Sequence, residues 1–195
     1  DSLSLLSDTW GQVSEAYEGS KKDFLLYWRG VLVAAPMFVG MLGMLVGGRL
    51  TDALVPRIGL KWARRLPLVA TKVSGAAAYA CCIWFSTFPS DSVFNSAVSY
   101  TVLFCVVALS TDLGNPAGWA FKQDVGGRYV GSVLGWGNMW GNFGAAVTAP
   151  ILLWVVGSPE RWDYAFMTCA GAFALSGVAA LGINAAIPIA PSDDE

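Results

Sequence analysis

The stretch "GGRLTDALVPRIGLKWARR" runs from Gly47 to Arg65 and separates two long apolar parts of the chain. Five of its residues are Arg or Lys, whereas the apolar parts on either side carry almost no charge. Basic residues collect in the short cytoplasmic loops of membrane proteins. The stretch therefore predicts a cytoplasmic connection between two membrane-spanning helices, and this prediction decides the class of fold.

The composition also indicates a membrane protein. Of the 195 residues, 55% are hydrophobic and 13% are charged, whereas about a quarter of the residues of a soluble domain are charged. The chain has 22 Gly and nine Trp; Gly allows close helix packing in lipid, and Trp favours the membrane interface. A net charge of -2 argues against nucleic acid as a partner, because such proteins carry a basic surface.

The residue types argue against an enzyme. The sequence has no histidine, which excludes a Ser-His-Asp triad and His-ligated zinc. A membrane-embedded enzyme would instead need another nucleophile and base, or a metal cluster, inside the apolar segments. The cysteines lack metal-ligand spacing and are interpreted as small buried apolar residues; they are Cys81, Cys82, Cys105 and Cys169. We expect no cofactor and no bound metal.

Several apolar segments are long enough to cross a bilayer, which needs about 20 residues per helix. They do not alternate as barrel strands would, so we predict an all-α polytopic bundle of about five spans, over residues 31–48, 66–88, 93–121, 129–157 and 164–190. Residues 1–28 are expected to form an extramembrane lead loop, with a short surface helix within it as the alternative. Residues 29–190 would form the transmembrane bundle and 191–195 a tail. Because residue 1 is Asp and no signal peptide follows, we expect a piece of a longer protein.

The charge distribution predicts sidedness. Loops 49–65 and 122–128 lie two spans apart and both carry basic residues, whereas loop 89–92 has none and loop 158–163 has only Arg161. The positive-inside rule therefore places the first two loops in the cytoplasm. The C-terminus would then lie inside and the lead segment outside, in a plasma or bacterial inner membrane.

The basic stretch resembles the signature loop of the major facilitator superfamily, roughly G-x-x-x-D-x-x-x-R-x-G-x-R. The matching residues are Gly48, Asp52, Arg57, Gly59 and Lys61. Upstream, Gly40, Gly43 and Gly47 invite close packing by a neighbouring helix. The resemblance implies that the acid helps to close the cytoplasmic side; the alternative is a solvated loop that only sets topology. The candidate gating residues are Gly48, Asp52, Arg57, Asp124 and Arg128.

A second stretch, Asn115 to Ile151, resembles the helix 10–11 region of the anion:cation symporter branch of that superfamily. The residues that carry this resemblance are Pro116, Trp119, Asp124, Arg128, Gly131, Gly135, Asn138, Gly141, Asn142, Gly144 and Pro150. The resemblance covers nearly the whole chain and implies helices 8 to 12 of such a transporter, with helix 7 and the N-terminal bundle missing. The chain departs from the pattern at Gly126-Gly127, where the branch has Pro, and at Asp112.

The physical chemistry of the second stretch supports a binding site. Asn138 and Asn142 are one helical turn apart and share a face. Carboxamides are costly in hydrocarbon unless they pair across helices or line a wet cavity, and both alternatives remain open. The resemblance implies that Asn138 and Trp119 contact a sugar acid or similar organic anion. Pro116 and Asn142 complete the candidate substrate-binding set.

Asp112 is the one acid inside a predicted span. Ionisable residues within a membrane are functional candidates, and Lys72 on the preceding span is a candidate partner. Asp112 is therefore a possible coupling residue for a proton or sodium ion; the alternatives are a structural ion pair and a water-exposed cavity residue.

Together the resemblances imply transport of a small organic anion by alternating access, coupled to protons or another cation, by a parent protein of which this chain is part. The expected partners are the lipid bilayer, the anionic substrate, a proton or sodium ion and the missing N-terminal bundle. The alternative is a membrane sensor or receptor that keeps the transporter fold without transport.

Overall fold

The computed structural model describes residues 2–157 and 161–189, with side chains described from Phe24 onward. The elements in chain order are α1 (Ser2–Ser86), α2 (Ala97–Gly126), the 3-10 helix η1 (Gly127–Tyr129), α3 (Val130–Val156) and α4 (Trp162–Ala180). Within these residues every regular element is a helix, which confirms the predicted all-α class.

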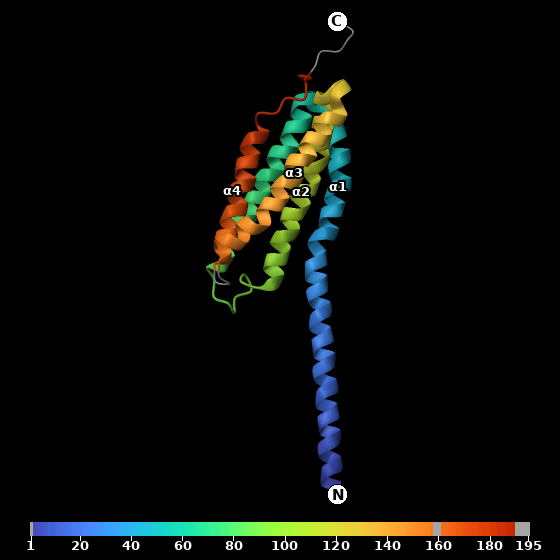
Figure 1. The fold of residues 1–195 in the computed structure, drawn as a ribbon, viewed down its shortest axis with the longest axis vertical. Helices are drawn as coiled ribbons and strands as arrows, with labels where there is room; N and C mark the ends of the chain where they lie inside the picture. The colour runs from blue at the N-terminus through green and yellow to red at the C-terminus, as the bar shows by residue number, and fades with distance from the viewer. Residues whose placement is uncertain (1, 158–160, 190–195) are drawn as a thin grey trace.

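Helix α1 is two helices joined at Gly59. This glycine has φ 76° and ψ 161°, a conformation that is essentially restricted to glycine because a side chain would clash with the backbone. Figure 1 shows the first half of α1 running to one end of the bundle and the second half running back along the bundle from there. The predicted connection 49–65 is therefore helical on both sides of a one-residue break, rather than a loop.

A second reversal lies between α2 and α3. Gly127 has φ 46° and begins η1, and α3 then runs back along the bundle (Figure 1). The Gly126-Gly127 pair, which departs from the Pro of the symporter pattern, thus supplies the residue that allows this turn. At the opposite end, α2 begins after Ser96, whose hydroxyl accepts a hydrogen bond from the Ser99 N–H at 3.3 Å. This is an ordinary N-cap.

Two predicted boundaries differ from the structure. The lead segment 1–28 was expected to be a loop, but the backbone is helical from Ser2, so α1 continues through it; its lower part projects beyond the other helices in Figure 1. The last predicted span, 164–190, is helical only as far as Ala180. Asn184 and Pro188 follow within the next residues, and both residue types favour turns over helix interiors.

Glycines let the first half of α1 approach α2 closely. Gly40, Gly43 and Gly47 are buried, and a Cβ added at Gly43 would lie 2.8 Å from the Leu109 carbonyl oxygen. A Cβ at Gly47 would lie 2.9 Å from Cα of Leu113. The predicted close packing along this stripe is confirmed.

The second half of α1 packs between α2 and α4. Ser110 on α2 donates a hydrogen bond to Ser74 at 2.9 Å, and Gly75 lies against Phe173 of α4. Helix α3, by contrast, has no buried residue within the described part of the chain. The bundle is therefore well packed among α1, α2 and α4, and α3 is covered on few sides.

In the part of the chain that the structure describes, three helical stretches are long and apolar enough to cross a membrane: Phe24–Ser86, Ala97–Val156 and Trp162–Ala180. The first two have 63 and 60 residues, about three times the length that a bilayer core requires. Each of the two reverses direction once, at Gly59 and at Gly127 (Figure 1). The fold is that of a helical membrane protein.

Candidate functional site

A buried arginine connects two helices at the end of the bundle that contains both reversals. Nε of Arg64, on the second half of α1, donates a hydrogen bond to Oδ2 of Asp124 at 2.7 Å. Arg64 is 7% exposed, and the Asp124 side chain is 22% exposed. This short, charge-assisted bond fixes the start of the second half of α1 against the last turn of α2.

Asp52 lies on the other side of the same guanidinium. Its Oδ1 is 4.0 Å from Nη1 of Arg64, and its side chain is 83% exposed. Nη1 of Arg64 and the hydroxyl of Thr51 are buried without a hydrogen-bond partner among the described residues. We call Arg64, Asp124 and Asp52 the polar clasp; it has one tight contact and one loose contact.

Backbone contacts hold the chain after α4 at the same end. Nε and Nη2 of Arg65 donate to the Ile183 carbonyl at 3.0 and 2.6 Å, and the Ile189 N–H donates to the Val125 carbonyl at 2.9 Å. The two basic stretches and the residues after α4 therefore share one end of the molecule. Which side of a membrane that end faces stays a prediction.

The structure brings only part of the predicted gating set together. Asp52 and Asp124 meet through Arg64, which the sequence reasoning had counted only as a basic residue of the loop. Gly48 lies half-buried in α1, and Arg57 and Arg128 are exposed, with the Arg128 guanidinium 5.0 Å from the Tyr129 ring centroid. The sequence "WARR" contains Arg64 and Arg65 side by side. Arg64 faces Asp124 because of the direction in which the helix after Gly59 turns its side chains.

The predicted substrate residue Trp119 has a lysine beside it. Nζ of Lys122 lies 4.8 Å from the Trp119 ring centroid, a cation–π distance. A Cβ added at Gly137 of α3 would lie 3.0 Å from Cε and Nζ of Lys122. The lysine thus passes over the backbone next to Asn138, and sequence reasoning had assigned it only a topological role.

The two asparagines are exposed on α3. Nδ2 of Asn142 donates to the Asn138 carbonyl at 3.0 Å, a bond within one helix turn. The described residues therefore do not pair these amides across helices, and whether they line a cavity stays a prediction. Pro116 lies within α2, half-buried, one helical turn before Trp119.

Asp112 and Lys72 face different neighbours. The Asp112 carboxylate lies against Gly40 on the first half of α1. Nζ of Lys72 lies 5.2 Å from the Phe173 ring centroid on α4. A Cβ added at Gly177 of α4 would lie 3.3 Å from the Cβ of Lys72. The suggested Asp112–Lys72 ion pair is therefore absent from the described structure, because Asp112 of α2 packs against the first half of α1 and Lys72 packs against α4.

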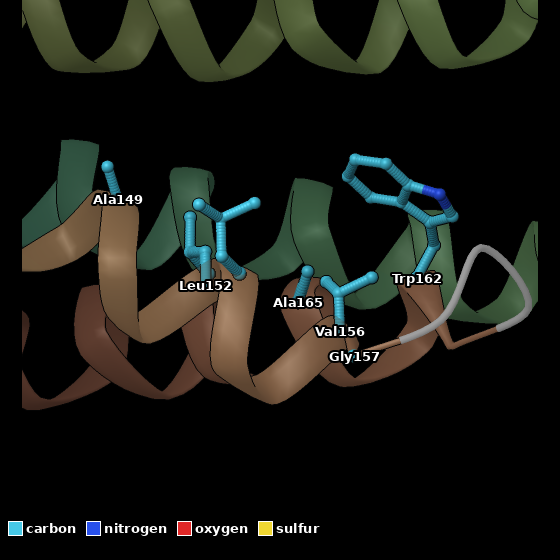
Figure 2. A pocket seen from close by; sticks show the side chains of 7 residues that line it. Ala149, Leu152, Val156, Gly157, Trp162 and Ala165 are labelled. Atoms are coloured by element: carbon cyan, nitrogen blue, oxygen red, sulfur yellow. The ribbon is translucent and has the colours of Figure 1, made fainter.

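A pocket of about 580 Å³ lies between the end of α3 and the start of α4. Figure 2 shows the Trp162 ring beside the aliphatic side chains that form its walls. The described lining residues are Ala149, Leu152, Leu153, Val156, Gly157, Trp162 and Ala165. Because none of them is charged, this pocket does not suit a small anion.

The fold and these sites define a class: a helical membrane protein with a charged clasp at one end and a lysine–tryptophan pair near a polar helix face. Over 183 residues the chain is 26% identical to the protein named "Probable sulfoacetate transporter SauU" of Cupriavidus necator, strain H16, and the match covers 92% of this chain. The chain spans 40% of that relative's length. This similarity supports a transporter and points away from an enzyme.

Two other comparisons gave no match. No family model matches the chain, and no solved structure gives a significant match.

Proposed function

We propose that this chain is part of a transporter that moves a small organic anion across a membrane by alternating access, as the C-terminal part of a major facilitator protein of the anion:cation symporter type. The proposal includes five membrane crossings, because α1 and the α2–α3 stretch each reverse at a glycine. It also includes a cytoplasmic position for the end that carries the polar clasp. An N-terminal bundle would complete the central site.

The observation that carries the proposal is the position of Lys122. Its ammonium group lies on the Trp119 ring and beside α3 at Gly137, the residue before Asn138, whose side chain is exposed. A cation, an aromatic wall and an amide donor are the groups that bind a carboxylate or sulfonate with a short polar body. The similarity to a probable sulfoacetate transporter agrees with this chemistry.

Alternating access needs contacts that differ between two states. The clasp is the candidate for such contacts, because Arg64 is bonded to Asp124 at 2.7 Å while Asp52 stands 4.0 Å away and exposed, free to come closer or move off. Arg57, Arg128 and Gly48 surround this end as the remaining gating candidates. Asp112, an acid packed against Gly40 inside the helical bundle, is the candidate for proton or sodium coupling.

Flux measurements test the proposal. The full-length protein that contains this chain would be reconstituted in liposomes, and uptake of labelled sulfoacetate and of a labelled sugar acid would be followed with and without a proton or sodium gradient. Transport predicts saturable uptake of one of these anions. A sensor that keeps the fold predicts binding without flux, and that result would replace the transport proposal.

Lys122→Gln tests the site within that assay. Losing a charge-assisted contact to the anion is expected to raise KM by about tenfold or more, whereas Lys122→Arg should keep most of the affinity. Arg161→Gln is the matched control, because Arg161 also lies over a ring, Tyr164, at 4.5 Å but at the other end of the bundle. Equal effects of the two Gln variants would refute the assignment of Lys122.

A further inference from the structure

An exposed tryptophan between two cations lies on the second half of α1, away from the lysine–tryptophan pair of the candidate anion site. Trp62 is 48% exposed. The Arg65 guanidinium lies 5.1 Å from its ring centroid, and Nζ of Lys61 lies 6.0 Å from it. Neither cation belongs to the polar clasp, whose arginine faces α2 instead.

The geometry leaves donors of this group available to a ligand. The Arg65 guanidinium has five N–H donors, and its two hydrogen bonds to the Ile183 carbonyl use Nε and Nη2. These bonds hold the charge in place beside the ring, so it is ordered before a ligand arrives. Lys61 adds three N–H donors on the neighbouring residue. One positive charge that is held in place and a second charge beside the same ring suit a phosphate ester.

An exposed apolar strip begins at the same place. Leu66 follows Trp62 by one helical turn, and Val73 continues in the same helical direction; both are exposed. Val73 lies beside α4, because its Cγ2 would be 4.0 Å from a Cβ at Gly177. On α4 and directly after it, Val178 and Leu181 are exposed as well. This apolar strip therefore begins next to Lys61, Trp62 and Arg65 and continues along α1 and α4.

The ligand chemistry follows from this arrangement. A free phosphate would use the charges and ignore the apolar strip, whereas an anionic phospholipid would use both. Tryptophan favours the depth of lipid headgroups, and basic groups near the ends of membrane helices bind anionic headgroups. We propose that Lys61, Trp62 and Arg65 form a binding site for one anionic phospholipid of the surrounding bilayer, whose acyl chains lie along Leu66 and Val73.

This site is separate from the transport proposal, since it needs neither flux nor the anion site at Lys122. The test uses the purified full-length protein in detergent, with phosphatidylglycerol and phosphatidylcholine added at equal concentrations and lipid adducts counted by native mass spectrometry. The protein should retain phosphatidylglycerol in preference to phosphatidylcholine. Lys61→Gln should weaken this retention about fivefold, the effect of removing one basic charge near an anionic headgroup, while Lys61→Arg should leave it unchanged.

Trp62→Leu provides a second variant that leaves both charges in place, and we expect it to weaken retention as well. Arg161→Gln is the control, because it removes a ring-bound cation at the other end of the bundle. Three outcomes would overturn the proposal: no preference for phosphatidylglycerol, equal loss in Lys61→Gln and Arg161→Gln, or displacement of the lipid by millimolar inorganic phosphate. The last outcome would show a site for free phosphate instead.

Discussion

Replacing Asp124 with Asn should destabilise the protein more than replacing Asp52 with Asn. Both acids face the same guanidinium, but Asp124 accepts a hydrogen bond at 2.7 Å and is 22% exposed, whereas Asp52 stands 4.0 Å away and is 83% exposed. The two substitutions make the same chemical change at one arginine. They therefore isolate the effect of distance and solvent exposure on one ion pair.

The expected magnitudes follow from burial. A hydrogen bond to a charged group contributes about 1.5–3 kcal/mol, and removing one partner of a buried ion pair costs about 3–5 kcal/mol. Asp124 is partly exposed and Asn keeps one acceptor oxygen, so we expect a loss of about 2 kcal/mol, the lower part of these ranges. An exposed pair contributes about 0–1 kcal/mol, so Asp52→Asn should change the stability by no more than about 0.5 kcal/mol.

Intrinsic tryptophan fluorescence during heating of the detergent-purified protein measures the effect. At about 2–4 °C per kcal/mol, Asp124→Asn should lower Tm by roughly 4–8 °C and Asp52→Asn by less than about 2 °C. Arg64→Gln combined with Asp124→Asn should be clearly less damaging than the sum of the single changes, because the pair is broken once. Equal shifts for the two Asn variants, or an additive double variant, would refute the clasp.

Three further predictions concern the glycines and the asparagine face. Gly47→Ala should lower Tm through overpacking worth about 1–3 kcal/mol, since its Cβ would meet the Leu113 backbone, whereas Gly48→Ala, with no atom within 4 Å, should leave Tm unchanged or raise it. Gly59→Ala should cost about 1–3 kcal/mol of backbone strain at φ 76°, measured against the same Gly48→Ala control. Asn138→Ala should abolish uptake by the full-length protein with unchanged membrane insertion; normal uptake would disprove the site assignment.

Periodicity and composition predicted the helices, but not where the helical backbone continues through a polar segment. The predicted spans 66–88, 93–121 and 129–157 lie mostly within helices, because long apolar runs in lipid satisfy their backbone hydrogen bonds internally. The segment 1–28 is helical although it is polar, and α4 ends at Ala180 although apolar residues continue. Apolar content alone therefore does not mark where these helices begin and end. For the end of α4, the turn-forming residues Asn184 and Pro188 were the signal in the sequence.

Contacts that depend only on residue size could be predicted from the sequence. Contacts that depend on which way a side chain points around its helix could not. The stripe Gly40, Gly43 and Gly47 could be placed from sequence, since small residues at this spacing admit a backbone. The partner of Asp124 could not. Arg57, Arg64 and Arg65 are all basic and close in sequence, and the backbone angles at Gly59 determine which one points toward α2. Lys122 follows Trp119 by three residues on α2, a spacing that makes helix neighbours, so this contact could have been predicted. Its place beside Gly137 could not, because that depends on where α3 turns back.

The last turn of α2 connects the clasp to the candidate anion site. Asp124 contacts α1 through Arg64, and Lys122 contacts α3 at Gly137; two residues apart on a helix, they project to nearly opposite sides. A rotation or shift of this turn therefore changes both contacts together. If an anion at Lys122 favours one position of the turn, it must bias the Arg64–Asp124 bond, and by linkage the state of that bond must change the affinity for the anion by the same factor. Such a connection needs no long chain of intermediates, because one helical turn carries both charges.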